Sequence, residues 1–179
     1  MTGIPGVGKT TVLLKTVETL RANGYGVGGM ISRDVRLHGN RIGFEILDLS
    51  SGEKGWLANV DQQWGPHVGK YRVNLDDLNN VGVKAILQAC ENLDIVVVDE
   101  IGPMELFSEQ FREAVRKTVD SRKLLICTVH WKMKNELIDN IKKREDVEVY
   151  VVTHDNREHL HETITREAGD FLGAKADGE

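Results

Sequence analysis

The chain has 179 residues, of which 40% are hydrophobic and 28% charged, and it carries a formal net charge of −5. These values fit one compact domain over residues 1–179, and the acidic balance argues against a nucleic-acid partner, which would need a basic surface. Because no apolar run approaches the roughly 18 residues of a membrane span and no signal peptide pattern follows Met1, we expect a cytoplasmic protein without a membrane partner.

Segments with helical and strand-like patterns alternate along the first part of the chain. Residues 9–21 have apolar side chains at helical spacing and are followed by Gly24, a suitable C-cap. Residues 25–32 and 41–49 have the composition and alternation of strands. The turn residues 38–40 between them indicate that the two strands form a β-hairpin insertion.

The second part of the chain continues the alternation after residues 50–73, whose glycines and polar side chains predict an irregular loop. Residues 94–99 (DIVVVD) form a nearly continuous β-branched run, which is typical of a strand buried on both faces of a parallel sheet. Strands separated by helices predict an α/β fold with a mostly parallel sheet and helices on both faces. The other predicted elements are helices over residues 75–91, 108–119, 134–143 and 156–171, and strands over residues 124–129 and 147–153.

A glycine-rich segment at the start of the chain matches the phosphate-binding motif GxxxxGK[ST] at every fixed position. Its glycines allow backbone N–H groups to turn toward phosphate oxygens, and the helix that begins near Lys9 adds the positive end of its dipole. Lys9 is expected to reach the β- and γ-phosphates, and the Thr10 hydroxyl to ligate Mg²⁺. The predicted nucleotide-binding residues of this loop are Gly3, Ile4, Pro5, Gly6, Val7, Gly8, Lys9, Thr10 and Thr11.

One feature departs from the usual context of this motif. A phosphate-binding loop normally follows a buried strand, yet only Met1 and Thr2 precede it here. We therefore expect that the first strand of the sheet is missing, or that the natural start lies upstream of Met1.

The strand predicted over residues 94–99 ends in two adjacent acids. Asp99 at the end of a buried strand is the position that holds Mg²⁺ in a Walker B motif. Glu100 can orient and polarise a water molecule for in-line attack on the γ-phosphate, although an acid there can also be a structural hydrogen-bond acceptor. An arginine often stabilises the charge that develops on the transferred phosphoryl group, and the candidates are Arg33, Arg36, Arg41, Arg112 and Arg157.

Together these passages resemble the nucleoside-triphosphatase family first known from thermophiles, which has a human relative called cancer-related nucleoside-triphosphatase. The resemblance covers nearly the whole chain, and its strongest parts are GIPGVGKTT at residues 3–11 and DEIGPMELFS at residues 99–108. Further similar passages are DVR at residues 34–36, RIGF at 41–44, VGKY at 68–71 and THDNR at 153–157.

The resemblance implies a RecA-like P-loop fold and slow, Mg²⁺-dependent hydrolysis of ATP, GTP and other nucleoside triphosphates to the diphosphate and phosphate. It implies catalytic roles for Lys9 and Glu100 and Mg²⁺ ligation by Thr10 and Asp99. Among the arginines it favours Arg36 as catalytic, and it suggests that Asn156 and Arg157 lie near the base. One departure is Trp131, at a position where an arginine is expected in archaeal-looking members.

Two other functions remain open at this point. A kinase acting on a nucleotide or another small molecule would need an acceptor site, which the loop at residues 50–73 with Trp56, Trp64 and Tyr71 could cover. A nucleotide-dependent switch or binding module would hydrolyse slowly and act through a partner. The absence of a guanine-specific NKxD motif weakens the switch hypothesis.

Overall fold

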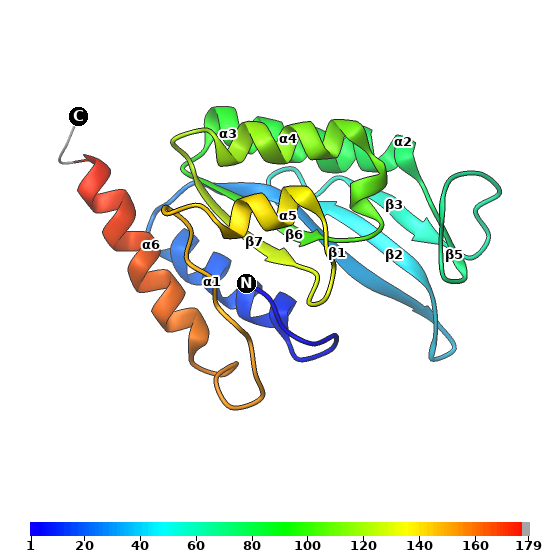
Figure 1. Cartoon of the computed structure of the whole chain (residues 1–179), viewed down its shortest axis with the longest axis horizontal. Helices are drawn as coiled ribbons and strands as arrows, with labels where there is room; N and C mark the ends of the chain where they lie inside the picture. The colour runs from blue at the N-terminus through cyan, green and yellow to red at the C-terminus, as the bar shows by residue number, and fades with distance from the viewer. Residues whose placement is uncertain (177–179) are drawn as a thin grey trace.

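The computed structural model describes residues 1–176, and within this range seven strands form one mixed sheet. The strand order is β4-β5-β3-β2-β1-β6-β7, and the sheet lies between two layers of helices (Figure 1). The strands are β1 (Val27–Leu37), β2 (Asn40–Asp48), β3 (Lys54–Asn59), β4 (His67–Val68), β5 (Tyr71–Val73), β6 (Ile95–Ile101) and β7 (Leu124–Val129).

The sheet is less parallel than the sequence predicts. Only β1, β6 and β7 pair in parallel, whereas β1–β2, β2–β3, β3–β5 and β4–β5 are antiparallel. His38 and Gly39, with φ of 48° and 80°, close the predicted β1–β2 hairpin, and such a tight turn permits only antiparallel pairing. The prediction of an irregular loop over residues 50–73 is wrong, because this segment contributes β3, β4 and β5. Each of these strands is stabilised by pairing with a neighbouring strand.

Helices cover both faces of the sheet, as predicted. In Figure 1, α3, α4 and α5 lie on one face and α1 and α6 on the other, and two separate hydrophobic clusters fill these layers. The helices are α1 (Lys9–Ala22), α2 (Leu75–Asp77), a π-helical turn (Leu78–Val83), α3 (Lys84–Asn92), a 3₁₀ turn (Glu105–Phe107), α4 (Glu109–Val119), α5 (Glu136–Lys142) and α6 (Leu160–Ala176). Within residues 1–176, each helix falls short of the length and apolarity that crossing a membrane requires.

Strand β6 connects the two hydrophobic layers. Val96 and Val98 pack into the layer of α3 and α4, while Ile95 and Val97 pack into the layer of α1 and α6. All four side chains are fully buried, which explains the continuous β-branched pattern of this strand. The strand therefore delivers the acids at its carboxyl end to the edge of the sheet where α1 begins.

The two residues before the phosphate-binding loop lie between the segment at residues 150–152 and strand β7, and they pair with both. Thr2 forms a parallel bridge with Val151, in which Thr2 N donates to Tyr150 O at 2.8 Å and Val152 N donates to Thr2 O at 2.8 Å. On the other side, Val129 N donates to Met1 O at 2.9 Å. The strand predicted over residues 147–153 is wrong in extent, because within residues 1–176 this segment forms only the isolated bridge of Val151 with Thr2.

Candidate active site

A cleft of about 620 Å³ opens where the carboxyl ends of β1 and β6 meet the start of α1. The phosphate-binding loop and the two acids near the carboxyl end of β6 line it together, although Thr10 and Asp99 are 89 residues apart in the sequence. The residues of the phosphate-binding loop and the two acids that line the cleft are Pro5, Gly6, Gly8, Lys9, Thr10, Asp99 and Glu100.

The loop preceding α1 has the backbone conformation that a phosphate cradle needs. Gly6 and Gly8 have φ of 77° and 110°, a region that side chains other than glycine rarely adopt. Gly8 is the N-cap of α1, so the first amides of the helix face the cleft entrance. The Lys9 ammonium donates to Gly3 O at 3.1 Å and lies 3.4 Å from Glu100 Oε2.

Asp99 joins three elements of the fold. Thr10 Oγ1 on α1 donates to Asp99 Oδ2 at 2.6 Å, and Thr128 Oγ1 on β7 donates to Asp99 Oδ1. Burial raises the pKa of Asp99, while the hydrogen bonds from Thr10 and Thr128 lower it in part. Thr128 is a contact that sequence reasoning missed, because nothing distinguishes it from the other residues of a buried strand.

A third carboxyl group, Glu105, lies beside the predicted pair of acids. A Cβ placed on Gly102 would lie 3.1 Å from both Glu100 Oε1 and Glu105 Oε2, so both carboxyl groups lie over this glycine. Burial raises the pKa of Glu100, against the opposing charge of Lys9. Burial also raises the pKa of Glu105 to about 8, with a further contribution from the charges of Glu100 and Asp99. Glu105 lies within the DEIGPMELFS passage, which was the available signal, but the sequence does not show its burial.

The buried Glu105 predicts a pH-dependent stability. In the folded protein its pKa is about 8 instead of 4.5, so between these values the folded chain holds a proton that the unfolded chain releases. Raising the pH through this window therefore lowers the free energy of unfolding. Glu105→Gln abolishes this contribution, and we expect its stability relative to the parent to increase as pH rises from 4.5 to 8.

Urea denaturation of the parent and variant across this pH range measures the difference. Glu18→Gln, at an exposed position on α1, is the matched control and should show no such trend. A constant difference between Glu105→Gln and the parent at every pH would contradict the prediction.

The arginines do not all lie where the sequence suggested. Arg33 and Arg41 line the cleft. Arg36 lies outside its lining, where it binds Asp34 Oδ2 and Gly39 O, each at 3.1 Å. Arg112 donates to Leu106 O and to Glu109. The structure therefore offers no contact that supports a catalytic role for Arg36, and that role stays a prediction.

Asn156 and Arg157, which the resemblance suggests lie near the nucleotide base, belong to a turn beside the phosphate-binding loop. A Cβ on Gly8 would lie 3.6 Å from Arg157 Cδ, so Arg157 is next to the loop but does not line the cleft. Asn156 closes the turn, because its Oδ1 accepts from Thr153 N at 2.8 Å and its Nδ2 donates to Val151 O at 2.9 Å.

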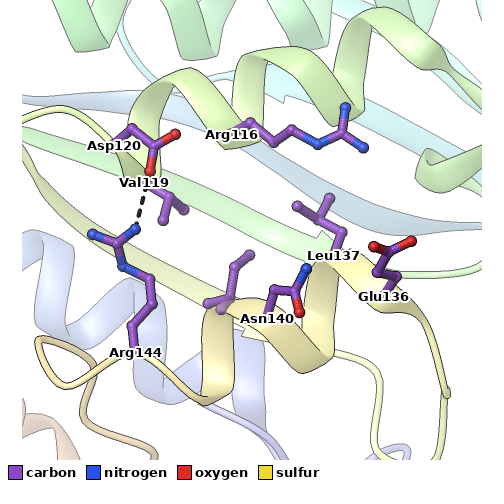
Figure 2. A pocket seen from close by; sticks show the side chains of 8 residues that line it. Arg116, Val119, Asp120, Glu136, Leu137, Asn140 and Arg144 are labelled. Atoms are coloured by element: carbon purple, nitrogen blue, oxygen red, sulfur yellow. Dashed lines mark hydrogen bonds and ion pairs between the residues drawn. The ribbon is translucent and has the colours of Figure 1, made fainter.

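A second hollow of about 320 Å³ lies between α4 and α5, and Figure 2 shows it from close by. Arg144 of the segment after α5 forms an ion pair with Asp120 of the segment after α4, with Nη1 3.0 Å from Oδ1. The hollow contains none of the predicted site residues, and it lies in the helix layer away from α1. None of the chemistry expected from the sequence is therefore assigned to this second hollow.

Curated relatives of this chain are named nucleoside-triphosphatases. The curated nucleoside-triphosphatase THEP1 of Thermofilum pendens is 46% identical over 173 residues, which is 96% of this chain and 95% of the relative. The corresponding protein of Methanothermobacter thermautotrophicus is 41% identical over 98% of both chains.

Two solved structures share the fold. The crystal structure of THEP1 from the hyperthermophile Aquifex aeolicus has a TM-score of 0.81 and 30% identity, and the match covers 91% of this chain and 94% of the other. The solution structure of a human cancer-related nucleoside triphosphatase has a TM-score of 0.78 and 36% identity over 92% and 93% of the two chains. The predicted P-loop α/β fold is thereby confirmed. A family model described as NTPase matches residues 1–165, and this chain therefore belongs to the NTPase family.

Proposed function

We propose that this protein hydrolyses nucleoside triphosphates to the nucleoside diphosphate and phosphate, with Mg²⁺ as its cofactor. The observation that carries the proposal is the convergence of Lys9, Thr10, Asp99 and Glu100 at one end of the cleft, with Lys9 Nζ 3.4 Å from Glu100 Oε2. The names of the relatives, which are nucleoside-triphosphatases, support the same reaction.

The residues present fit a magnesium ion. Thr10 Oγ1 and Asp99 Oδ2 are 2.6 Å apart and face each other, and Mg²⁺ prefers such oxygen ligands together with substrate phosphates. Within residues 1–176, no cluster of three His, Cys, Asp or Glu side chains could hold a metal ion by itself, so phosphate oxygens would complete the site. A bound Mg²⁺ neutralises charge on the β- and γ-phosphate oxygens.

The remaining residues of the site have two roles, which are to bind the phosphates and to accept the proton of the attacking water. The amides at the start of α1 and the Lys9 ammonium hold the phosphates and stabilise negative charge on the leaving diphosphate. Phosphate oxygens compete with Glu100 for Lys9, which leaves the Glu100 carboxylate available to accept a proton from the attacking water. The raised pKa of Glu100 makes this carboxylate a stronger base than an exposed glutamate.

Phosphate release from ATP, GTP, CTP and UTP tests the proposal directly. We expect slow release from several of the four nucleotides in the presence of Mg²⁺, because the phosphate contacts are independent of the base. Chelation with EDTA should reduce release to background, and added Mg²⁺ should restore it. If the protein binds nucleotide but releases no phosphate from any of the four, the proposed hydrolysis is wrong.

A further inference from the structure

The cleft continues beyond the phosphate-binding loop. Its far part, which we call the distal compartment, is formed by Arg33, Arg41, Phe44, Val68 and Met104. The whole cleft measures about 620 Å³, within the range that holds complete small-molecule ligands. The turn beside Gly8, where the nucleoside of the triphosphate is expected, does not line the cleft. The distal compartment therefore offers space that the triphosphate does not account for.

The compartment has a preformed cationic and aromatic wall. Arg41 Nε donates to Tyr71 Oη at 3.1 Å and Arg41 Nη1 to Asp34 Oδ1 at 3.3 Å, while its guanidinium carbon lies 4.9 Å from the centre of the Phe44 ring. These contacts fix the planar cation against the ring. Preorganised groups of this kind bind a ligand without the cost of ordering flexible side chains.

Arg33 adds a second positive charge to the compartment. Among residues 1–176 it makes no hydrogen bond or ion pair, and yet its side chain lines the cleft. Val68 and Met104 are half-buried apolar side chains that line the same space. An apolar and aromatic wall beside two arginines is complementary to a molecule with a planar ring and an anionic group.

The position of the compartment suits a molecule that takes part in the reaction. In-line transfer requires the nucleophile to approach the γ-phosphorus from the side opposite the leaving diphosphate. The phosphate-binding loop follows a segment that pairs with β7, whereas the β1–β2 hairpin, which carries Arg33, Arg41 and Phe44, pairs on the opposite side of β6. Glu100 in β6 therefore lies between the loop and the hairpin. A ligand there would approach from the side at which the attacking water is expected.

We propose that the distal compartment binds a nucleoside monophosphate as a phosphoryl acceptor, with its base against Phe44 and its phosphate between Arg33 and Arg41. The inference rests on the proposed function, because it uses the same triphosphate site. An oxygen of the monophosphate forms a bond to the γ-phosphorus, and the bond from the γ-phosphorus to the β-bridging oxygen breaks. The bridging oxygen keeps the electron pair, so one triphosphate and one monophosphate yield two diphosphates.

The two reactions place different demands on Glu100. Hydrolysis requires a proton to leave the attacking water, which is the role proposed for the Glu100 carboxylate. The monophosphate oxygen carries no proton at pH 8, because the second pKa of a phosphate monoester is about 6. Glu100→Gln should therefore suppress phosphate release and preserve phosphoryl transfer.

The experiment incubates the protein with Mg²⁺ and γ-³²P-labelled ATP at pH 8 and adds AMP, GMP, CMP or UMP in turn. Labelled diphosphate and labelled free phosphate are separated and counted in the same samples. We expect labelled diphosphate from at least one monophosphate, both with the parent protein and with Glu100→Gln. Lys9→Ala, purified in the same way, should form none, which excludes a contaminating kinase.

Variants of the compartment test where the acceptor binds. Arg33→Gln removes a cation that makes no hydrogen bond or ion pair within residues 1–176, and Phe44→Ala removes the ring. Each should lower diphosphate formation by roughly tenfold or more, as expected for the loss of a charged hydrogen bond or of stacking area. Arg116→Gln, an exposed arginine on α4, is the control and should change neither product.

The two products separate the possible outcomes. Phosphate release without labelled diphosphate, in both the parent and Glu100→Gln, would overturn the acceptor site and leave the proposed hydrolysis intact. Labelled diphosphate without free phosphate would support the acceptor site and overturn hydrolysis as the activity of this protein. Formation of diphosphate that Arg33→Gln and Phe44→Ala both leave unchanged would overturn the distal compartment as the binding site.

Discussion

Glu100→Gln is expected to lower phosphate release by at least roughly 10²-fold, the size of a lost general base, while nucleotide binding survives. Glutamine keeps the shape of the side chain but cannot accept the proton of the attacking water. The phosphate contacts come from the loop before α1 and from Lys9, which this substitution leaves in place. Single-turnover phosphate release and the Kd for a fluorescent nucleotide analogue measure the two effects separately.

Two comparisons make this result specific. Lys9→Ala should weaken nucleotide binding as well as phosphate release, because its ammonium is one of the proposed phosphate contacts. Glu91→Gln removes an exposed carboxylate that pairs with Lys117 at 3.2 Å, far from the cleft, and should change neither quantity. Phosphate release by Glu100→Gln at the parent rate would show that Glu100 is a structural acceptor and not the base.

Gly29→Ala is expected to destabilise the protein by roughly 2–6 kcal/mol, the sum of typical costs of backbone strain and overpacking. Gly29 lies in β1, paired with Val97 of β6, and has a φ of 115°. A Cβ there would lie 2.1 Å from Val97 O and 2.8 Å from Val97 N. Both atoms belong to the centre of the sheet, so they cannot move aside without breaking the pairing of β1 with β6.

Gly24→Ala is the matched control, because it shares the unfavourable backbone but not the steric overlap. Gly24 has a φ of 91°, and a Cβ there would meet no atom within 4 Å. Its expected cost is about 1–2 kcal/mol, that of a left-handed conformation in a residue with a side chain. Urea denaturation of both variants measures the difference, and equal losses of stability would contradict the proposed overlap in the sheet.

The phosphate-binding end of the site could be predicted because its chemistry is local in the sequence. The cradle consists of consecutive backbone amides that lead into a helix, so glycines, Lys9 and Thr10 must occur together. The two acids lie near the carboxyl end of β6, a strand whose burial on both faces is visible as a β-branched run. The structure places Thr10 Oγ1 2.6 Å from Asp99 Oδ2. The sequence predicted that these two residues lie close together, because both were expected to ligate the same Mg²⁺ ion.

The structure corrected the elements that depend on distant neighbours. Strands β3, β4 and β5 have only six, two and three residues, and they exist because adjacent strands pair with them, which no local pattern reveals. The segment at residues 147–153 has a strong strand pattern but, within the described residues, forms one isolated bridge with Thr2. In both cases the partner decided the outcome and the local preference did not.

The sequence by itself determined the chemistry of the phosphate site, the family and the alternation of helices with strands, because each depends on residues that are close together in the chain. Only the tertiary structure decided which side chains share the cleft. The cleft is lined by Arg33, Arg41 and Phe44 of the β1–β2 hairpin and by Met104 and Glu105 after β6. Arg36 of the same hairpin lies outside this lining. Strand register and the packing of a turn against the sheet set these positions, and both arise from contacts between residues far apart in the sequence.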